Sequence, residues 1–315
     1  QFTSMYEAFK DNSSFNQDLS AWDTSSVTNM SSMFYGATSL ANISLPDTSK
    51  VTDMANMFDG ATSLVSVTLP QTGNVTHMGE MFARATNLVS VTLPDTGNVT
   101  SMSSMFYGAT SLANISLPQT GAVTDMSAMF ALASSLTSAS LPNTGAVTDM
   151  GYMFYSATSL TSVSLPNTGA VTDMSSMFSR ATSLTSISLP KTGAVTDMSY
   201  MFSVATSLTS VSIPQTGAVR HMSGMFYNAT SFAQDIRAWD VSSVSNFSET
   251  FSGATAMIAA YSSTPNWNIT PTAAWFTPDT TAPTMTITAA EVNDGDISND
   301  GTLSLTFTLS EATSN

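Results

Sequence analysis

A Met-Phe pair recurs along this chain at a constant interval of 24 residues, and this repeat limits the possible folds more than any other feature. The pair first stands at Met33-Phe34 and last at Met225-Phe226, with the same interval at every step between them. A period of about 20 to 50 residues is typical of solenoids and other repeat arrays. Each unit must therefore form one small structural element that buries its apolar side chains against its neighbours.

The first half of a unit carries apolar residues with helical spacing. The unit that begins at Val171 reads VTDMSSMFSRATSLTSISLPKTGA. Its first apolar residues fall at positions i, i+3, i+6, i+7 and i+10, namely Val171, Met174, Met177, Phe178 and Ala181. This spacing predicts a short helix with one buried face. Thr172 and Asp173 stand where a helix N-cap and a first-turn acid are expected.

The second half of the unit predicts a short strand. Leu184, Ile187 and Leu189 have Ser or Thr between them, so one side is apolar and the other carries hydroxyl groups. Pro190 ends a hydrogen-bonded ladder, and Gly193 allows the chain to turn. The sequence therefore predicts an α/β repeat solenoid with one short strand and one short helix in each 24-residue unit.

The residue pattern of the unit changes at both ends of the array. Residues 15–34 read FNQDLSAWDTSSVTNMSSMF, and residues 232–247 read FAQDIRAWDVSSVSNF. These strings resemble the FNQDxSxWDxSxVTxMxxMF signature of the BspA-like leucine-rich-repeat proteins of bacterial and protist surfaces. The resemblance covers roughly residues 1–252. It implies a right-handed leucine-rich-repeat-like coil, surface exposure, and a role in adhesion or in a matrix.

The residues after the array have a different pattern. Residues 253–280, with Trp267, Trp275 and Phe276, are expected to form a C-terminal cap and linker. Residues 281–315 contain segments that alternate apolar and polar residues, which predicts half-buried strands. They resemble the first strands of bacterial Ig-like adhesin modules. Because an Ig sandwich needs about 100 residues, we expect only a partial β-sandwich here and interpret the chain as a segment of a larger protein.

Composition excludes several classes of partner. The chain has 7 Lys and Arg against 22 Asp and Glu, a net charge of −15, and basic residues that stand singly. Nucleic acids and anionic membranes are bound by clustered Lys and Arg. No apolar run reaches the ~20 residues of a membrane span, and the sequence contains no cysteine. We therefore expect neither a nucleic-acid partner nor a membrane span in this segment.

Threonine and serine form candidate ligand columns on the outer side of the predicted strands. Four successive units have Thr at one position with Ser beside it, and the candidate residues are Thr137, Thr161, Thr185, Thr209, Ser162 and Ser186. In the first half of the array the Thr position holds Ala41, Val65, Val89 and Ala113. Ice-binding solenoids resemble this pattern in their flat hydroxyl ladders, and a glycan is the other ligand considered.

Carboxylates provide two candidate calcium sites. One column contains Asp125, Asp149, Asp173 and Asp197. Helix capping explains Asp at this position, and calcium bridging between coils is the alternative. In the tail, Asp294, Asp296 and Asp300 lie among other oxygen donors, which suits calcium, and a plain Asp-Gly turn is the alternative. Calcium is the only cofactor that the sequence suggests.

Other polar residues have simpler interpretations. The N-x-S/T sequons provide candidate glycosylation sites if the source is a eukaryote, and those considered are Asn42, Asn74, Asn98, Asn114 and Asn228. His77 and His221 stand far apart at the Asp position and have no clustered partners for catalysis or metal binding. The methionines recur at the spacing of the apolar face and are expected to fill the core.

The sequence contains no recognisable catalytic set, so an enzyme is not expected. The favoured hypothesis is a non-enzymatic structural or adhesive repeat protein, located extracellularly or at the cell surface, within a larger surface or filament-forming protein. Its expected partners are other copies of itself, surface or matrix proteins, and glycans. The alternative is a module that binds glycan or ice through the Ser/Thr-rich strand face.

Overall fold

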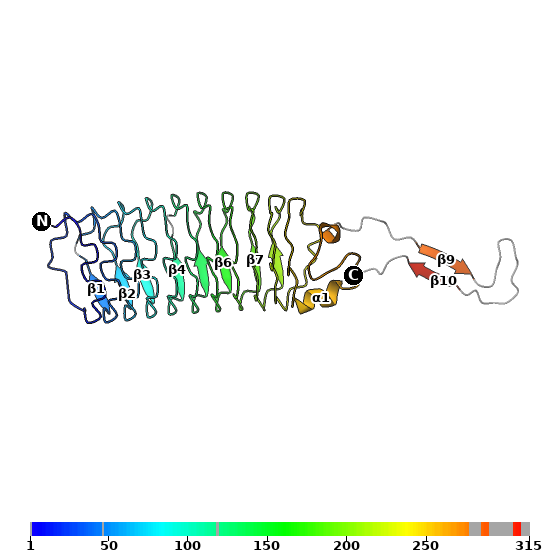
Figure 1. Cartoon of the computed structure of the whole chain (residues 1–315), viewed down its shortest axis with the longest axis horizontal. Coiled ribbons are helices and arrows are strands. Elements are labelled where there is room, and N and C mark those ends of the chain that lie inside the picture. Colours follow the sequence, from blue (N-terminus) through cyan, green and yellow to red (C-terminus); the bar gives the residue numbers. More distant parts are fainter. Residues whose placement is uncertain (1, 46, 118–119, 277–284, 290–304, 310–315) are drawn as a thin grey trace. The chain divides into compact units, whose positions relative to one another are not determined.

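The computed structural model describes residues 2–45, 47–117, 120–276, 285–289 and 305–309. The contacts within the chain divide it into two units, residues 1–276 and residues 277–315. Each unit is described by itself. The first is a stack of similar coils that follow one another along a single axis (Figure 1).

Each coil from the second to the ninth contributes one three-residue strand. The strands are β1 (Asn42–Ser44), β2 (Ser66–Thr68), β3 (Ser90–Thr92), β4 (Asn114–Ser116), β5 (Ser138–Ser140), β6 (Ser162–Ser164), β7 (Ser186–Ser188) and β8 (Ser210–Ser212). They pair in parallel, and each residue lies opposite the residue 24 positions later, as Asn42 does with Ser66. The sheet orders are β1-β2-β3, β4-β5-β6 and β7-β8. The strands therefore lie where the alternation of apolar and hydroxyl residues predicts them.

The first half of each coil forms consecutive turns, so the predicted helix in each unit is wrong. The Met33 N–H donates to the Met30 carbonyl at 3.2 Å and closes a turn within the coil. The Met30 and Ser32 N–H groups donate instead to Asp53 and Ala55 of the next coil, at 3.0 and 2.8 Å. In an α-helix both would donate within their own coil. The i, i+3 spacing fits a helix and a series of turns equally well, which explains why the inward residues are still predicted correctly.

Within the described residues, helical structure occurs only after the repeats. The two elements are α1 (Thr255–Tyr261) and the 3₁₀ helix η1 (Ala273–Phe276). This segment contacts the last coil, since Phe251 donates its backbone N–H to the Ile269 carbonyl at 2.9 Å. The rings of Trp267 and Trp275 also lie 5.2 and 5.4 Å from the Phe251 ring. In the part of the chain that is described, no helix has the length and apolar character needed to cross a membrane.

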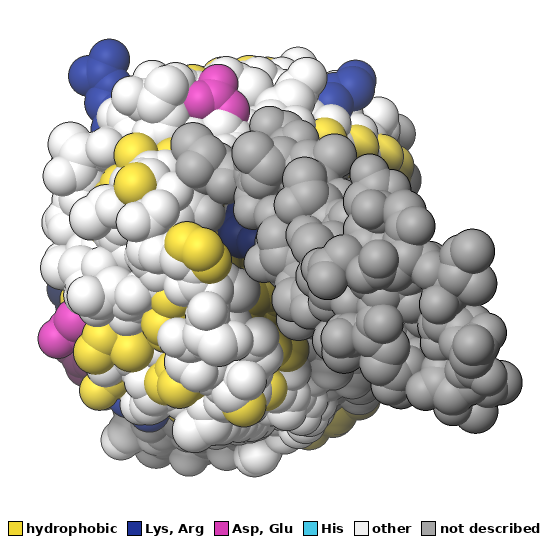
Figure 2. Space-filling view, turned by 90° about the vertical axis from the view of Figure 1, so that its right-hand side faces the viewer, with side chains coloured by type: hydrophobic (Ala, Val, Ile, Leu, Met, Phe, Trp, Pro, Cys, Tyr) yellow, Lys and Arg dark blue, Asp and Glu magenta, His cyan; other side chains and the backbone are white. Residues whose placement is uncertain are grey.

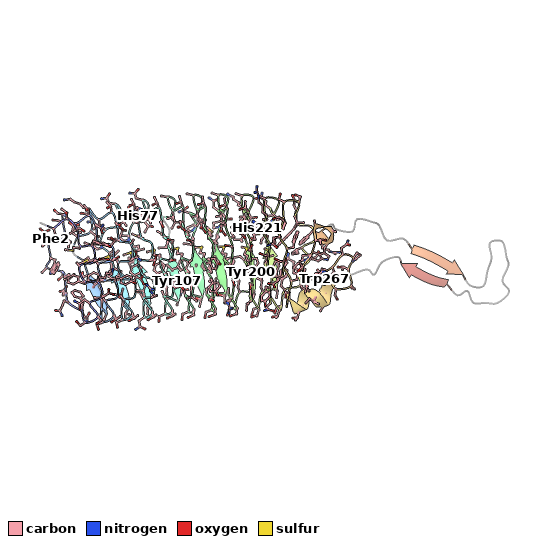
Figure 3. The ribbon with its side chains drawn as sticks, viewed as in Figure 1. Phe2, His77, Tyr107, Tyr200, His221 and Trp267 are labelled. Atoms are coloured by element: carbon pink, nitrogen blue, oxygen red, sulfur yellow. The ribbon has the colours of Figure 1, made fainter. Side chains whose placement is uncertain are left out.

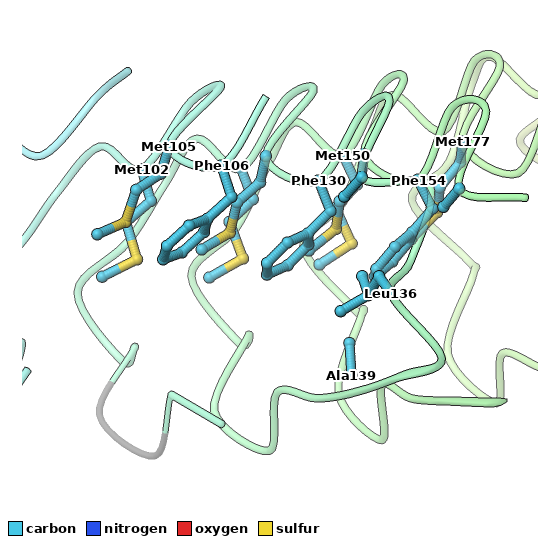
Figure 4. Close-up of a cluster of buried hydrophobic side chains, with 14 of the residues drawn as sticks. Met102, Met105, Phe106, Phe130, Leu136, Ala139, Met150, Phe154 and Met177 are labelled. Carbon is cyan, nitrogen blue, oxygen red and sulfur yellow. The ribbon is translucent and has the colours of Figure 1, made fainter. Parts of the chain in front are cut away.

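Stacked side chains of the same type fill the interior. The rings of Phe106, Phe130 and Phe154 lie parallel, with successive centroids 5.6 and 5.5 Å apart. Methionines such as Met102 and Met150 lie beside these rings and are fully buried (Figure 4). The predicted core is confirmed in the unit that begins at Val171. Its buried residues include Met174, Met177, Phe178, Leu184, Ile187 and Leu189. The outward residues predicted there are exposed, namely Thr185, Ser186 and Ser188.

A second ladder consists of threonines buried near the end of each coil, and the sequence pattern does not predict it. The hydroxyls of Thr120 and Thr192 donate to the backbone carbonyls of Asn143 and Gln215, each at 2.6 Å. The same contact recurs in other coils, from Thr24, Thr48, Thr72, Thr144, Thr168 and Thr216. Each bond joins one coil to the next and satisfies the hydroxyl of a buried threonine. These threonines therefore hold neighbouring coils in register.

The described part of the second unit is one antiparallel strand pair. It consists of β9 (Met285–Ala289) and β10 (Leu305–Leu309), with Leu305 opposite Ala289. The calcium candidates of the tail, Asp294, Asp296 and Asp300, lie outside the described residues.

Candidate ligand-binding face

The outward side chains of β1–β8, together with the residue before each strand, form a surface that we call the hydroxyl face. Parallel pairing places equivalent residues of successive coils in columns, as it does for Ser138 and Ser162 and for Ser186 and Ser210. The structure thereby brings the predicted ligand residues onto one surface. Those that are exposed there are Thr137, Thr161, Thr185, Thr209, Ser162 and Ser186.

Backbone carbonyls orient the threonine hydroxyls of this face. Thr137, Thr161 and Thr209 each donate their hydroxyl hydrogen to the carbonyl of the residue 24 positions earlier, at 3.1 Å. A hydroxyl oxygen has two acceptor sites besides its hydrogen. Because the hydrogen is used within the protein, the exposed oxygen offers mainly acceptor sites to a ligand. This arrangement suits a ligand that carries many hydroxyl donors.

The two halves of the hydroxyl face differ in polarity. Val65 and Val89, which precede β2 and β3, are 45% and 52% exposed. Threonine takes this place before β5 to β8. Over β6–β8 the surface is hollowed by about 500 Å³, and hydroxyl residues of all three strands line this hollow. The second half therefore offers the more polar contact surface.

A second hollow of about 680 Å³ adjoins the first at the C-terminal end of the hydroxyl face. Val211 and Ser212 line both hollows. Gln234 and Trp239 line the second from the following coil. Neither residue belongs to the predicted ligand columns. The sequence feature that marks them is the replacement of the L-P-x-T-G pattern by A-W-D at the end of the array.

Charged side chains are sparse on this molecule, at 9% of the sequence. Figure 2 shows the end of the stack near α1, where neutral polar and hydrophobic side chains predominate. The surface is therefore better suited to hydrogen bonding and apolar contact than to ionic attraction.

The Asp column caps turns and not helices. The Oδ1 atoms of Asp125, Asp149 and Asp173 each accept the N–H of the residue two positions later, at 2.9, 2.8 and 2.7 Å. Burial raises the pKa of Asp149; the Gly151 N–H opposes this shift, and the charges of Asp173 and Asp125 add to it. His77 and His221 occupy the same column at exposed positions (Figure 3). In the described part of the chain, no three His, Cys, Asp or Glu residues are grouped to hold a metal ion.

Comparison with known proteins identifies the family. The family described as "Mycoplasma protein of unknown function, DUF285" matches residues 1–69, 38–140, 76–186 and 161–267. The chain belongs to this family. No curated protein matches the chain.

Bacterial leucine-rich repeat proteins are among the solved structures similar to this DUF285 member. One from Bacteroides ovatus is 24% identical with a TM-score of 0.41, and the match covers 62% of this chain and 54% of that protein. One from Eubacterium ventriosum is 17% identical with a TM-score of 0.42, covering 76% and 64%. The T. pallidum leucine-rich repeat protein is 17% identical with a TM-score of 0.33, covering 64% and 71%. The chain thus matches about half the length of the Bacteroides protein.

The candidate glycosylation residues of this DUF285 member have different surroundings. Asn42 and Asn114 begin strands and are exposed. Asn74 and Asn98 are also exposed, but their side-chain NH₂ groups donate to backbone carbonyls of the preceding coil at 2.6 Å. Asn228 is half-buried. A glycan on Asn74 or Asn98 would replace a hydrogen bond between coils, so Asn42 and Asn114 are the more accessible candidates.

Proposed function

We propose that this chain is a non-enzymatic adhesive module of an extracellular or cell-surface protein, and that its hydroxyl face binds neutral glycans. The observation that carries the proposal is the continuous row of exposed hydroxyl groups on parallel strands, with Thr137, Thr161 and Thr209 oriented by backbone carbonyls. A repeat solenoid offers such a surface over many coils, which suits an extended ligand.

The charge of the molecule supports a neutral ligand. With a net charge of −15 and few basic residues, the chain repels anionic polymers. A glycan without charged groups avoids this repulsion and supplies hydroxyl donors to the acceptor oxygens of the face. Matrix proteins and further copies of the chain are the other partners that the same surface could contact.

Residues 281–315 are proposed to begin an Ig-like module that links this solenoid to further parts of a larger surface protein. The antiparallel pair of β9 and β10 supports this proposal. Their alternating apolar and polar residues would give each strand one buried face in a complete sandwich.

The test compares two double variants in an adhesion assay on immobilised neutral polysaccharides. Thr137→Leu with Thr161→Leu replaces two oriented hydroxyls on the hydroxyl face. Thr148→Leu with Thr172→Leu is the matched control, because those exposed threonines also donate to the preceding coil at 3.1 Å but belong to another column. We expect the first pair to lose adhesion and the control pair to retain it.

Equal adhesion by the parent and the hydroxyl-face variant would exclude this face as the binding site. Measurements of ice growth with the same proteins address ice as the alternative ligand. Inhibition by the parent and the control, but not by the hydroxyl-face variant, would assign the face to ice. Melting temperatures within about 2 °C of each other establish that the two double variants are comparably folded.

A further inference from the structure

The hollow at the C-terminal end of the hydroxyl face combines an aromatic ring with hydrogen-bonding groups. Its volume of about 680 Å³ lies within the range of small-ligand sites. Ser212 of β8 and Gln215 line it from one coil, and Gln234, Trp239 and Asp240 line it from the next. The hollow over β6–β8 and the one beside Pro70 and Pro94 contain no aromatic ring. This end of the face therefore differs chemically from the rest.

Trp239 is held firmly at the edge of this hollow. Its backbone N–H donates to the Ile236 carbonyl at 3.0 Å. Its ring centroid lies 6.2 Å from that of buried Phe226, with an angle of 38° between the rings. The side chain is half-buried and packs partly on the core. The part that borders the hollow is consequently a preformed aromatic surface.

Two polar side chains of the hollow are also fixed in place. The Gln234 Oε1 atom accepts the Val211 N–H at 2.7 Å, which orients the carboxamide and leaves its NH₂ group unused by that contact. The Asp240 Oδ1 atom accepts the Ser242 N–H at 3.0 Å. The Ser242 side chain and backbone together hold the pKa of Asp240 below its usual value, so this carboxylate is ionised at neutral pH. The hollow thus presents one oriented donor and one oriented acceptor.

These groups match the chemistry of a pyranose sugar. The negative face of an aromatic ring attracts weakly positive C–H groups, and a pyranose carries such groups on its flat side. Its ring hydroxyls can accept from an amide and donate to a carboxylate. No Lys or Arg lines the hollow, and Asp240 disfavours a phosphate, sulfate or uronic acid. A neutral hexose fits the donors, the acceptor and the charge together.

We propose that this hollow binds one neutral pyranose unit, which stacks on Trp239 and hydrogen-bonds to Gln234 and Asp240. The proposal rests on the glycan-binding function proposed above and names the place where the glycan is anchored. Because Val211 and Ser212 line both hollows, the next sugar units of a linear glycan would lie over β8, β7 and β6.

Affinity electrophoresis of the whole chain in gels that contain mannan, xylan or mixed-linkage β-glucan tests this anchor. We expect Trp239→Ala to weaken binding of the retained polysaccharide by about tenfold. Trp22→Ala is the matched control. The backbone N–H of Trp22 also donates to the carbonyl three residues earlier, that of Leu19, at 2.9 Å. Its exposed ring packs on Phe9, with ring centroids 5.8 Å apart. The hollow at that end does not include Trp22. We expect this variant to bind as the parent does.

Asp240→Asn provides a second measurement that does not remove a packed side chain. We expect it to weaken binding several-fold at unchanged melting temperature, because a neutral amide accepts a sugar hydroxyl less strongly than a carboxylate. Bound sugar should also change the tryptophan fluorescence of the parent but not that of Trp239→Phe.

Each outcome has a defined meaning. Retention of full affinity by both Trp239→Ala and Asp240→Asn would overturn the anchor, and so would equal losses in Trp239→Ala and Trp22→Ala. If the threonine double variant of the hydroxyl face loses binding in the same gels while both hollow variants bind normally, the proposed function stands without this anchor. A parent that none of the three polysaccharides retards would overturn both proposals.

Discussion

Replacing buried Thr192 with valine tests the threonine ladder directly. The substitution keeps the shape of the side chain but removes the hydroxyl that donates to the Gln215 carbonyl at 2.6 Å. Thr192 is fully buried, and its bond to Gln215 is part-buried. The net contribution of one such hydrogen bond is about 0.5–1.5 kcal/mol. We therefore expect Thr192→Val to lower the free energy of unfolding by that amount.

Thr196→Val, four residues later at the start of the next coil, is the matched control. Thr196 also donates to a neighbouring coil, at 3.2 Å to Thr172, but it is only half-buried and water can reach the carbonyl. A substitution in such a setting usually changes stability by less than about 0.5 kcal/mol. Urea denaturation followed by circular dichroism measures both variants. The reasoning would be refuted if Thr192→Val were as stable as the parent, or if the two variants lost equal stability.

Two further predictions concern the Asp column and the tail. Burial raises the pKa of Asp149 above its unfolded value, so its ionised form costs stability at neutral pH, and this cost disappears as the pH falls through the folded pKa. Asp149→Asn should therefore melt at a higher temperature than the parent at pH 7, with a smaller difference at pH 4; a lower melting temperature at pH 7 would contradict this. A chain that ends at Phe276 should melt within about 2 °C of the full chain, because residues 1–276 form one compact unit with its own core. If the tail links units, analytical ultracentrifugation of this shortened chain should also show less end-to-end association.

Several features of this protein follow from the sequence alone. The 24-residue interval specifies a stack of coils, because one coil cannot bury Met177, Phe178 and Ile187 by itself. The alternation around Ile187 also predicts which side of each strand is inward and which side carries hydroxyl groups. These conclusions require only the spacing of the apolar residues. That spacing does not depend on which carbonyl accepts each backbone N–H.

The partners of the backbone amides were decided only by the tertiary structure. Met30 and Ser32 donate to the next coil, so turns form where the local spacing also permits a helix. The hydrogen bond of the Thr192 hydroxyl likewise requires a carbonyl from the following coil, that of Gln215. The hollow at Trp239 requires side chains from two coils, which no local pattern brings together. In a solenoid the period specifies the interior, whereas contacts between coils decide the backbone conformation and the surface sites.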